Sequence, residues 1–172
     1  MKIFLNPGHG GSDPGAVSKN GLKEKDVTKH ICTILGKMLE KDGHSVIIYQ
    51  EVQSFHEVAK EENKSGVDLF ISVHCNSFSN ASANGVETLY FPTSSKGEIL
   101  AQCIQKSLVN ITKLYNRNIK PRSDLYVLKH TIAPAALVET AFISNPNEEK
   151  LLRDKPELFA EGIYYGIKKY IA

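Results

Sequence analysis

Two histidines and two glutamates stand at positions where side chains from distant parts of the chain could share one ion. His9 lies in a loop rich in glycine and proline that follows the apolar residues 3–5. His74 ends the largely apolar stretch 68–74, and Glu139 lies late in another such stretch, 134–142. A carboxylate in an apolar setting is costly to bury unless it is paired, lies near a metal or takes part in chemistry.

The fourth residue, Glu24, follows from helix geometry. At 100° per residue it falls on the same side as Val27, Ile31 and Leu35, so it faces the core from the first turn of a helix. Two histidines, one carboxylate and a water form a catalytic zinc shell, and a second carboxylate beside that shell can serve as general base. We therefore predict one site built from His9, Glu24, His74 and Glu139.

Each of these residues also has a plainer explanation. His9 could be incidental to a tight turn, His74 could be a hydrogen-bonded structural histidine, and Glu24 could be an ordinary charge at a helix start. Glu139 is the hardest of the four to explain in this way. The glycine-rich first loop could instead cradle a phosphate, but it contains neither of the usual glycine-rich phosphate-binding motifs.

Other candidate ligands are weaker. His56 and Glu57 begin like the H-E-x-x-H zinc motif, but Lys60 stands where the second histidine belongs. Cys75 adjoins His74, and neighbouring side chains on a strand point to opposite faces. His130 lies in a loop from which it could reach the site. His30 and His44 are predicted to be structural or exposed.

The elements that must position these residues alternate along the chain. Apolar residues recur at helical spacing in several segments, and β-branched or apolar runs lie between them. Strands are predicted at 2–6, 45–49, 68–74, 85–91, 125–128 and 135–142, and helices at 24–41, 54–64, 95–115, from 145 onward, and at 157–171. Phe55 and Ile99 are predicted to face inward, and residues 75–84 and 116–125 are predicted to be loops.

This alternation predicts a single α/β domain whose mostly parallel, twisted sheet has about six strands and carries helices on both faces. In such sheets ligands bind beyond the carboxyl ends of the strands. His9 follows a predicted strand, His74 ends another and Glu139 lies late in a third. Glu24 begins a helix that starts at the same edge. The predicted fold thus brings all four residues together.

Composition excludes several other classes of protein. A net charge of +2 over 172 residues, with no basic stripe, argues against nucleic-acid binding. No apolar run approaches the roughly 20 residues of a membrane span. The three cysteines are widely spaced and include no C-x-x-C pair, which argues against a disulfide framework or a structural zinc knuckle.

Taken together, the motifs resemble those of zinc-dependent N-acetylmuramoyl-L-alanine amidases. They occur in the family's order and cover nearly the whole chain. The motifs are Asn6-Pro7-Gly8-His9-Gly10-Gly11 with Asp13 and Gly15, Glu24-Lys25-Asp26, Ser72-Val73-His74-Cys75-Asn76, Gly85-Val86-Glu87-Thr88, and Leu137-Val138-Glu139-Thr140-Ala141-Phe142-Ile143-Ser144-Asn145.

The resemblance implies that residues 1–172 are the catalytic domain of a peptidoglycan hydrolase with one zinc ion. This enzyme would cut the amide between N-acetylmuramic acid and the L-alanine of the stem peptide. The resemblance makes His9, Glu24 and His74 the zinc ligands and Glu139 the catalytic acid and base. Asn76 borders the expected cleft and is a candidate substrate contact. We expect a monomer.

Two alternatives remain open from the sequence. One is a zinc peptidase that acts on another peptide amide, and the other is a non-catalytic module that binds the cell wall on the same fold. The N-terminus lacks the features of a signal peptide. This predicts either cytoplasmic synthesis with lysin-type release to the cell wall, or a domain excised from an exported protein.

Overall fold

Six strands form one sheet in a computed structural model that describes residues 1–50 and 54–172. The strands are β1 (Lys2–Pro7), β2 (Ser45–Ile48), β3 (Leu69–Asn76), β4 (Val86–Tyr90), β5 (Asn116–Pro121) and β6 (Ala135–Phe142). Their order across the sheet is β2-β1-β3-β6-β4-β5. Every neighbouring pair is parallel except β4 with β6, which is antiparallel.

Six helices are present in the described part of the chain. They are α1 (Glu24–Lys41), α2 (Phe55–Ser65), α3 (Ser95–Thr112), α4 (Tyr126–His130), α5 (Pro146–Asp154) and α6 (Pro156–Ile171). One of them, α5, begins as its sequence predicts. Asn145 caps α5 by accepting hydrogen bonds from the backbone of Asn147 and Glu148, and Pro146 follows at the first helical position.

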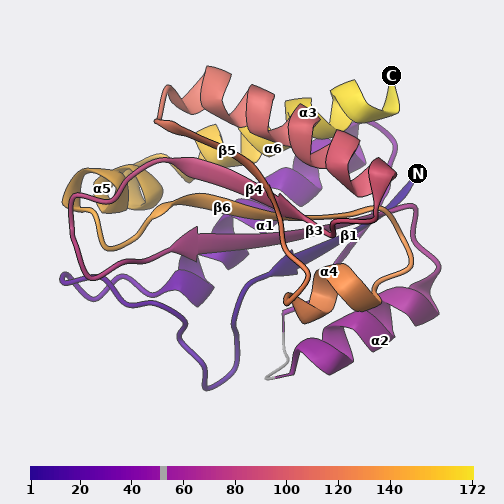
Figure 1. The fold of residues 1–172 in the computed structure, drawn as a ribbon, viewed down its shortest axis with the longest axis horizontal. Helices are drawn as coiled ribbons and strands as arrows, with labels where there is room; N and C mark the ends of the chain where they lie inside the picture. Colours follow the sequence, from indigo (N-terminus) through magenta and orange to yellow (C-terminus); the bar gives the residue numbers. More distant parts are fainter. Residues whose placement is uncertain (51–53) are drawn as a thin grey trace.

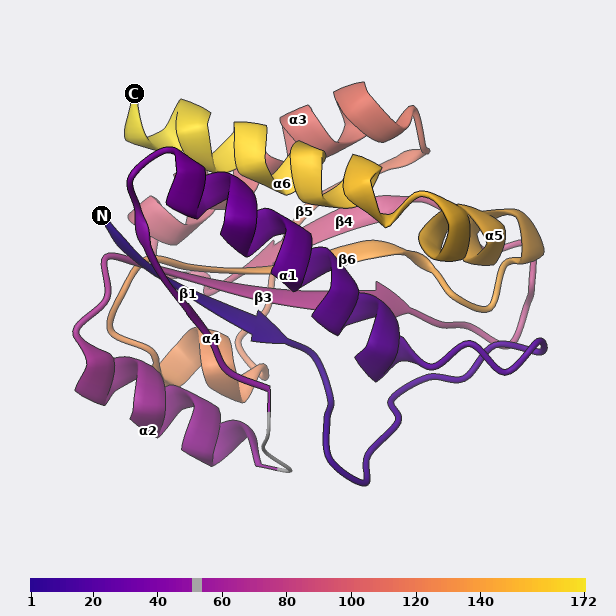
Figure 2. The same cartoon turned by 180° about the vertical axis from the view of Figure 1, so that it is seen from behind.

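The helices cover the two faces of the sheet unequally. α1, α3 and α6 pack on one face, over the larger apolar core, whereas α2 and α4 lie on the other (Figures 1 and 2). The larger core includes Ile71 and Val138 from the sheet together with Ile31, Ile104 and Ile163 from the three helices. The predicted α/β fold, with a mostly parallel sheet and helices on both faces, is confirmed.

The face beneath α2 and α4 changes character along its strands. At one end Phe4, Phe70 and Leu137 belong to the smaller apolar core, which Val58 of α2 and Val127 of α4 complete. Toward the carboxyl ends of β3 and β6 the same face becomes polar. His74 and Glu139 stand opposite each other there, and Glu139 in turn faces Glu87 on β4. The apolar half anchors the helices, and the polar half is available for chemistry.

Two predicted elements between residues 116 and 130 are wrong. The segment predicted as a loop, 116–125, begins with strand β5, which pairs with β4 at the edge of the sheet. The segment predicted as a strand, 125–128, begins helix α4 instead. Its apolar run is too short for periodicity to separate helix from strand, and Val127 and Leu128 bury themselves by packing against the smaller core.

Two side chains predicted to face inward are also exposed. Phe55 at the start of α2 is 56% exposed, and Ile99 on α3 is 52% exposed. No helix in the described residues is long and apolar enough to cross a membrane.

Candidate metal centre

His9 is held in an unusual backbone conformation just after β1. Its φ of 61° lies in the left-handed region, which few residues other than glycine adopt. Its Nδ1 lies 2.7 Å from Oδ2 of Asp13, so the carboxylate can accept a proton held on that nitrogen. This leaves Nε2 to face the core, where it lies 3.2 Å from Oε2 of Glu24. A carboxylate on one ring nitrogen commonly orients a histidine whose other nitrogen binds a metal.

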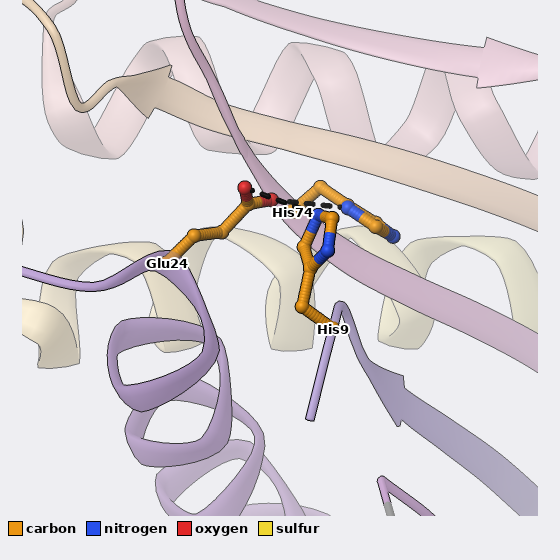
Figure 3. A group of neighbouring side chains, drawn as sticks. All are labelled: His9, Glu24 and His74. Carbon is orange, nitrogen blue, oxygen red and sulfur yellow. Dashed lines mark hydrogen bonds and ion pairs between the residues drawn. The ribbon is translucent and has the colours of Figure 1, made fainter. Parts of the chain in front are cut away.

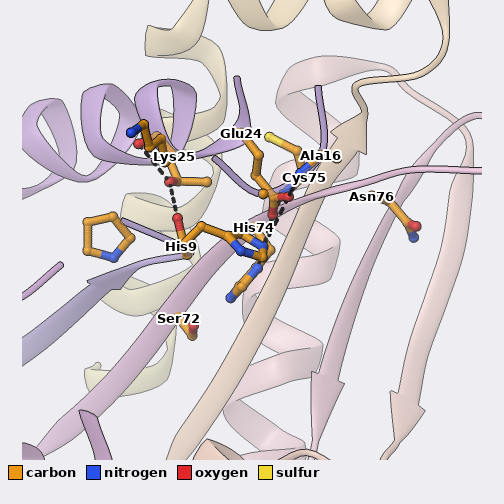
Figure 4. A network of polar contacts seen from close by, with 12 residues as sticks. His9, Ala16, Glu24, Lys25, Ser72, His74, Cys75 and Asn76 are labelled. Carbon is orange, nitrogen blue, oxygen red and sulfur yellow. Dashed lines mark hydrogen bonds and ion pairs between the residues drawn. The ribbon is translucent and has the colours of Figure 1, made fainter. Parts of the chain in front are cut away.

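Glu24 is the first residue of α1 and is only 3% exposed. Its Oε2 accepts a hydrogen bond from the backbone of Ala16 (2.9 Å), and its Oε1 accepts one from the backbone of Cys75 (3.0 Å). Oε1 also lies 3.1 Å from Nδ1 of His74. Burial alone would raise the pKa of Glu24, but the bonds to His74 and His9 reverse this effect and lower its pKa. The lowered pKa keeps the carboxylate charged. The contacts drawn in Figure 4 fix it in place.

The three side chains converge from a loop, a helix start and a strand (Figure 3). One potential ligand atom from each of His9, Glu24 and His74 lies within 4.8 Å of the others. The hydrogen bond to Glu24 is the main reason that the pKa of His9 rises to about 9, although burial opposes it. Two imidazoles and one carboxylate are a known donor set for catalytic zinc, and a divalent cation would take the place of the proton on His9.

Glu139 stands beside this cluster on β6. Its Oε2 is buried and has no hydrogen-bond partner among the described residues. The pKa of Glu139 is raised to about 7, chiefly by burial and also by the charges of Glu24 and Glu87, while the charges of the two histidines oppose the rise. An unpartnered buried carboxyl oxygen next to three convergent donors fits a centre that holds an ion and its ligands.

Asn76 lies at the end of β3, away from the cluster (Figure 4). Its amide nitrogen donates a 3.2 Å hydrogen bond to Oε1 of Glu87. Oε2 of Glu87 accepts bonds from Nε of Arg117 (3.1 Å) and Nζ of Lys120 (2.5 Å). Asn76 thus lies in a polar group between the cluster and the sheet edge, and its role as a substrate contact stays a prediction.

The alternative ligands lie elsewhere. His130 stacks on Tyr126 with ring centroids 4.1 Å apart, and His56 stacks on the same ring at 5.1 Å. His30 is exposed on α1. Cys75 packs into the larger core on the opposite face from His74, as the alternation of strand side chains predicts. None of these four residues belongs to the group of described side chains that could share an ion.

The support that the carboxylate of Asp13 gives to His9 was not predicted from the sequence. The position of Asp13 four residues after His9, next to Pro14, was the available signal. The contact by which α5 supports the first loop was also not predicted. Glu149 of α5 accepts hydrogen bonds from Ser18 (3.0 Å) and Asn20 (2.6 Å), which ties the first loop to the body of the protein.

Close packing around Gly15 gives a testable consequence. A Cβ there would lie 2.6 Å from Cδ2 of His9 and 2.7 Å from Oε2 of Glu24, and the φ of Gly15 is +66°. We expect Gly15→Ala to weaken metal binding by about 10- to 100-fold, as loss of ligand-supporting contacts typically does. Competition with a chromophoric chelator measures this affinity.

Gly21→Ala is the matched control. Gly21 lies in the same loop with a φ of +85°, but a Cβ there would meet nothing within 4 Å. Both variants should lose about 1 kcal/mol of stability to left-handed backbone strain. Equal metal affinity in the two variants would show that Gly15 does not shape the centre.

Comparison with known proteins assigns the chain to a family. The chain matches the family model described as N-acetylmuramoyl-L-alanine amidase over residues 3–169. It is 33% identical over 175 residues to N-acetylmuramoyl-L-alanine amidase LytC of Bacillus subtilis (strain 168), an alignment that covers 98% of this chain. The chain spans only 35% of the length of that relative.

In two further matches this chain covers more of the length of the matched protein. The germination-specific N-acetylmuramoyl-L-alanine amidase of Bacillus subtilis (strain 168) is 31% identical over 188 residues, which is 98% of this chain and 78% of that protein. The crystal structure of N-acetylmuramoyl-L-alanine amidase from Clostridium difficile 630 superposes with a TM-score of 0.93 at 32% identity, covering 99% of this chain and 96% of the other.

Proposed function

This chain belongs to the N-acetylmuramoyl-L-alanine amidase family, and from that premise we propose that it hydrolyses peptidoglycan at the amide between N-acetylmuramic acid and the first L-alanine of the stem. One observation carries the proposal. Glu139, a half-buried residue with one fully buried carboxyl oxygen and a pKa of about 7, stands beside the convergent His9, Glu24 and His74. Residues 1–172 would form the catalytic domain, and the bacterial cell wall would be its place of action.

His9, Glu24 and His74 would hold one zinc ion, in keeping with their donor chemistry. When bound, the ion supplies a Lewis acid that polarises the scissile carbonyl and lowers the pKa of a water molecule. The surrounding residues keep the ligands in position. Asp13 fixes the ring of His9, and the backbone N–H groups of Ala16 and Cys75 fix the carboxylate of Glu24.

Glu139 would move the protons. Its carboxylate accepts a proton from the water as the water attacks the carbonyl carbon. The resulting carboxylic acid then donates that proton to the nitrogen of alanine as the carbon–nitrogen bond breaks. A group that must act first as base and then as acid works best with a pKa near the working pH, and burial brings the pKa of Glu139 to about 7.

Digestion of purified muropeptides tests the proposal. We expect one new product amine, located on the first L-alanine by amine labelling and mass spectrometry, and no release after treatment with a chelator. A new amine inside the stem would instead identify a zinc peptidase acting on another peptide bond. Binding of cell walls by the metal-loaded protein without any cleavage would identify a non-catalytic binding module.

A further inference from the structure

A cavity of about 360 Å³ connects the proposed catalytic residues with a permanently charged side chain. His74 and Glu139 line it together with Arg122, and Leu89 and Leu137 supply part of its apolar lining. Leu137 and Leu89 face each other across β6 and β4, two residues along their strands from Glu139 and Glu87. A molecule in this cavity would therefore meet Glu139, an apolar surface and a guanidinium.

The position of Arg122 is well defined. It directly follows β5, and its backbone N–H donates a 2.8 Å hydrogen bond to the carbonyl of Tyr90 at the end of β4. Its Nε and Nη2 donate to the two carboxylate oxygens of Asp124 at 2.8 and 2.6 Å. A guanidinium carries five N–H donors in a planar fork, so this pair leaves donors for a second acceptor. The side chain is 42% exposed.

One guanidinium and two carboxyl groups, those of Arg122, Asp124 and Glu139, line the cavity. Glu24 is paired with the histidines, and Glu87 with Arg117 and Lys120. Asp124 chiefly, with smaller contributions from Glu87 and Glu139, raises the pKa of Arg122. Among the described residues that line the cavity, Arg122 is the only lysine or arginine. An anionic substrate that approaches Glu139 needs a nearby cation, and Arg122 is the one provided.

We propose that Arg122 binds the first free carboxylate of the peptide stem, the α-carboxylate of its second residue, and so makes the enzyme prefer stems in which this group is not amidated. This inference rests on the proposed function. Two residues of extended chain span at most about 7 Å, and a long arginine side chain can cover the remaining separation within one cavity. The small first residue, alanine, would lie against the apolar surface formed by Leu89 and Leu137.

Two soluble muramyl peptides that differ only in carboxylate or amide at this position test the inference. We expect the wild type to cleave the carboxylate form with a kcat/KM at least about tenfold higher. Arg122→Gln should lower kcat/KM for that form by about 10- to 100-fold, which is typical for loss of a charge-assisted hydrogen bond, and change the amide form by no more than about threefold. An equal effect of the substitution on both substrates, or no effect on either, would overturn the inference.

Arg153→Gln is the matched control. Arg153 is 46% exposed and also pairs with an aspartate, Asp154, but it lies on α5 and not among the residues that line the cavity. Its substitution should leave the ratio between the two substrates as in the wild type. A changed ratio in this variant would attribute the preference to overall charge and count against Arg122.

Binding measurements distinguish a failure of the inference from a failure of the proposed function. Calorimetry on the metal-loaded Glu139→Gln protein measures the affinity for both peptides without turnover, with and without Arg122→Gln. If the wild type cleaves neither peptide but Arg122→Gln selectively weakens binding of the carboxylate form, the proposed function fails and Arg122 remains the group that binds the carboxylate. If the wild type frees the amino group of the first alanine but the binding ratio does not depend on Arg122, the inference alone fails.

Discussion

Glu139→Gln is expected to lower kcat/KM for muramyl-L-alanine substrates by about 10³-fold, the middle of the range for loss of a general acid and base. Glutamine has nearly the same shape as glutamate, but its amide cannot accept and then return a proton. The ion should remain, because Glu139 is not one of the three convergent donors. Initial rates and metal stoichiometry, measured on the same preparation, check both parts.

Two further variants make this result specific. Glu139→Asp keeps a carboxylate that is one methylene shorter, so it should retain more activity than the glutamine variant. Glu157→Gln, at an exposed position on α6, should behave like the wild type. Activity of Glu139→Gln within tenfold of the wild type would mean that another group moves the protons.

Glu139→Gln should also change how the free energy of unfolding of the metal-free protein depends on pH. The pKa of Glu139 rises from 4.5 to about 7 on folding, so its ionisation opposes the fold. Below about pH 4.5 the group is protonated in both states and does not oppose folding. As the pH rises from 4.5 through 7, the free energy of unfolding falls by about 3 kcal/mol in total. Urea unfolding in chelator should therefore show Glu139→Gln more stable than the wild type at pH 8.5, and the two nearly equal at pH 4.5. Parallel stability curves would contradict the raised pKa.

The convergence of these side chains could be predicted from the sequence because Glu24, His74 and Glu139 each have a local signature. Glu24 falls on the apolar stripe of a helix whose predicted bounds, 24–41, match α1. His74 and Glu139 lie in apolar runs long enough to specify buried strands, and parallel strands bring their carboxyl ends to one edge. Periodicity and topology together were sufficient for these positions.

The segment from β5 to α4 could not be predicted in the same way. β5 is an edge strand, with exposed or half-buried side chains and backbone hydrogen bonds to β4, so its sequence carries little apolar pattern. α4 is only five residues long, and packing against the smaller core decides its conformation. Arg122 lies between these two elements. Its place in the cavity therefore depends on a loop path that no local pattern specifies.

The second large effect concerns the ion itself. His74→Ala removes one of three converging donors, and we expect loss of most bound zinc and an activity loss of at least about 10³-fold, since the water-activating chemistry requires the ion. Zinc at 100 times its dissociation constant should stabilise the wild type by about 2.7 kcal/mol, whereas the variant should show no such shift. Metal analysis and unfolding with and without zinc measure these effects independently of catalysis.

His30→Ala tests whether the effect is specific to the centre, because His30 is exposed on the same helix that Glu24 begins. It should keep stoichiometric zinc and full activity. In His74→Ala the carboxylate of Glu24 stays buried but loses a 3.1 Å partner, so the metal-free variant should also unfold more easily, by about 2 kcal/mol. If His74→Ala instead retains both the ion and the zinc-dependent stabilisation, the ion must bind elsewhere. The buried Glu24 carboxylate would then serve to hold His9 and the first loop against β3.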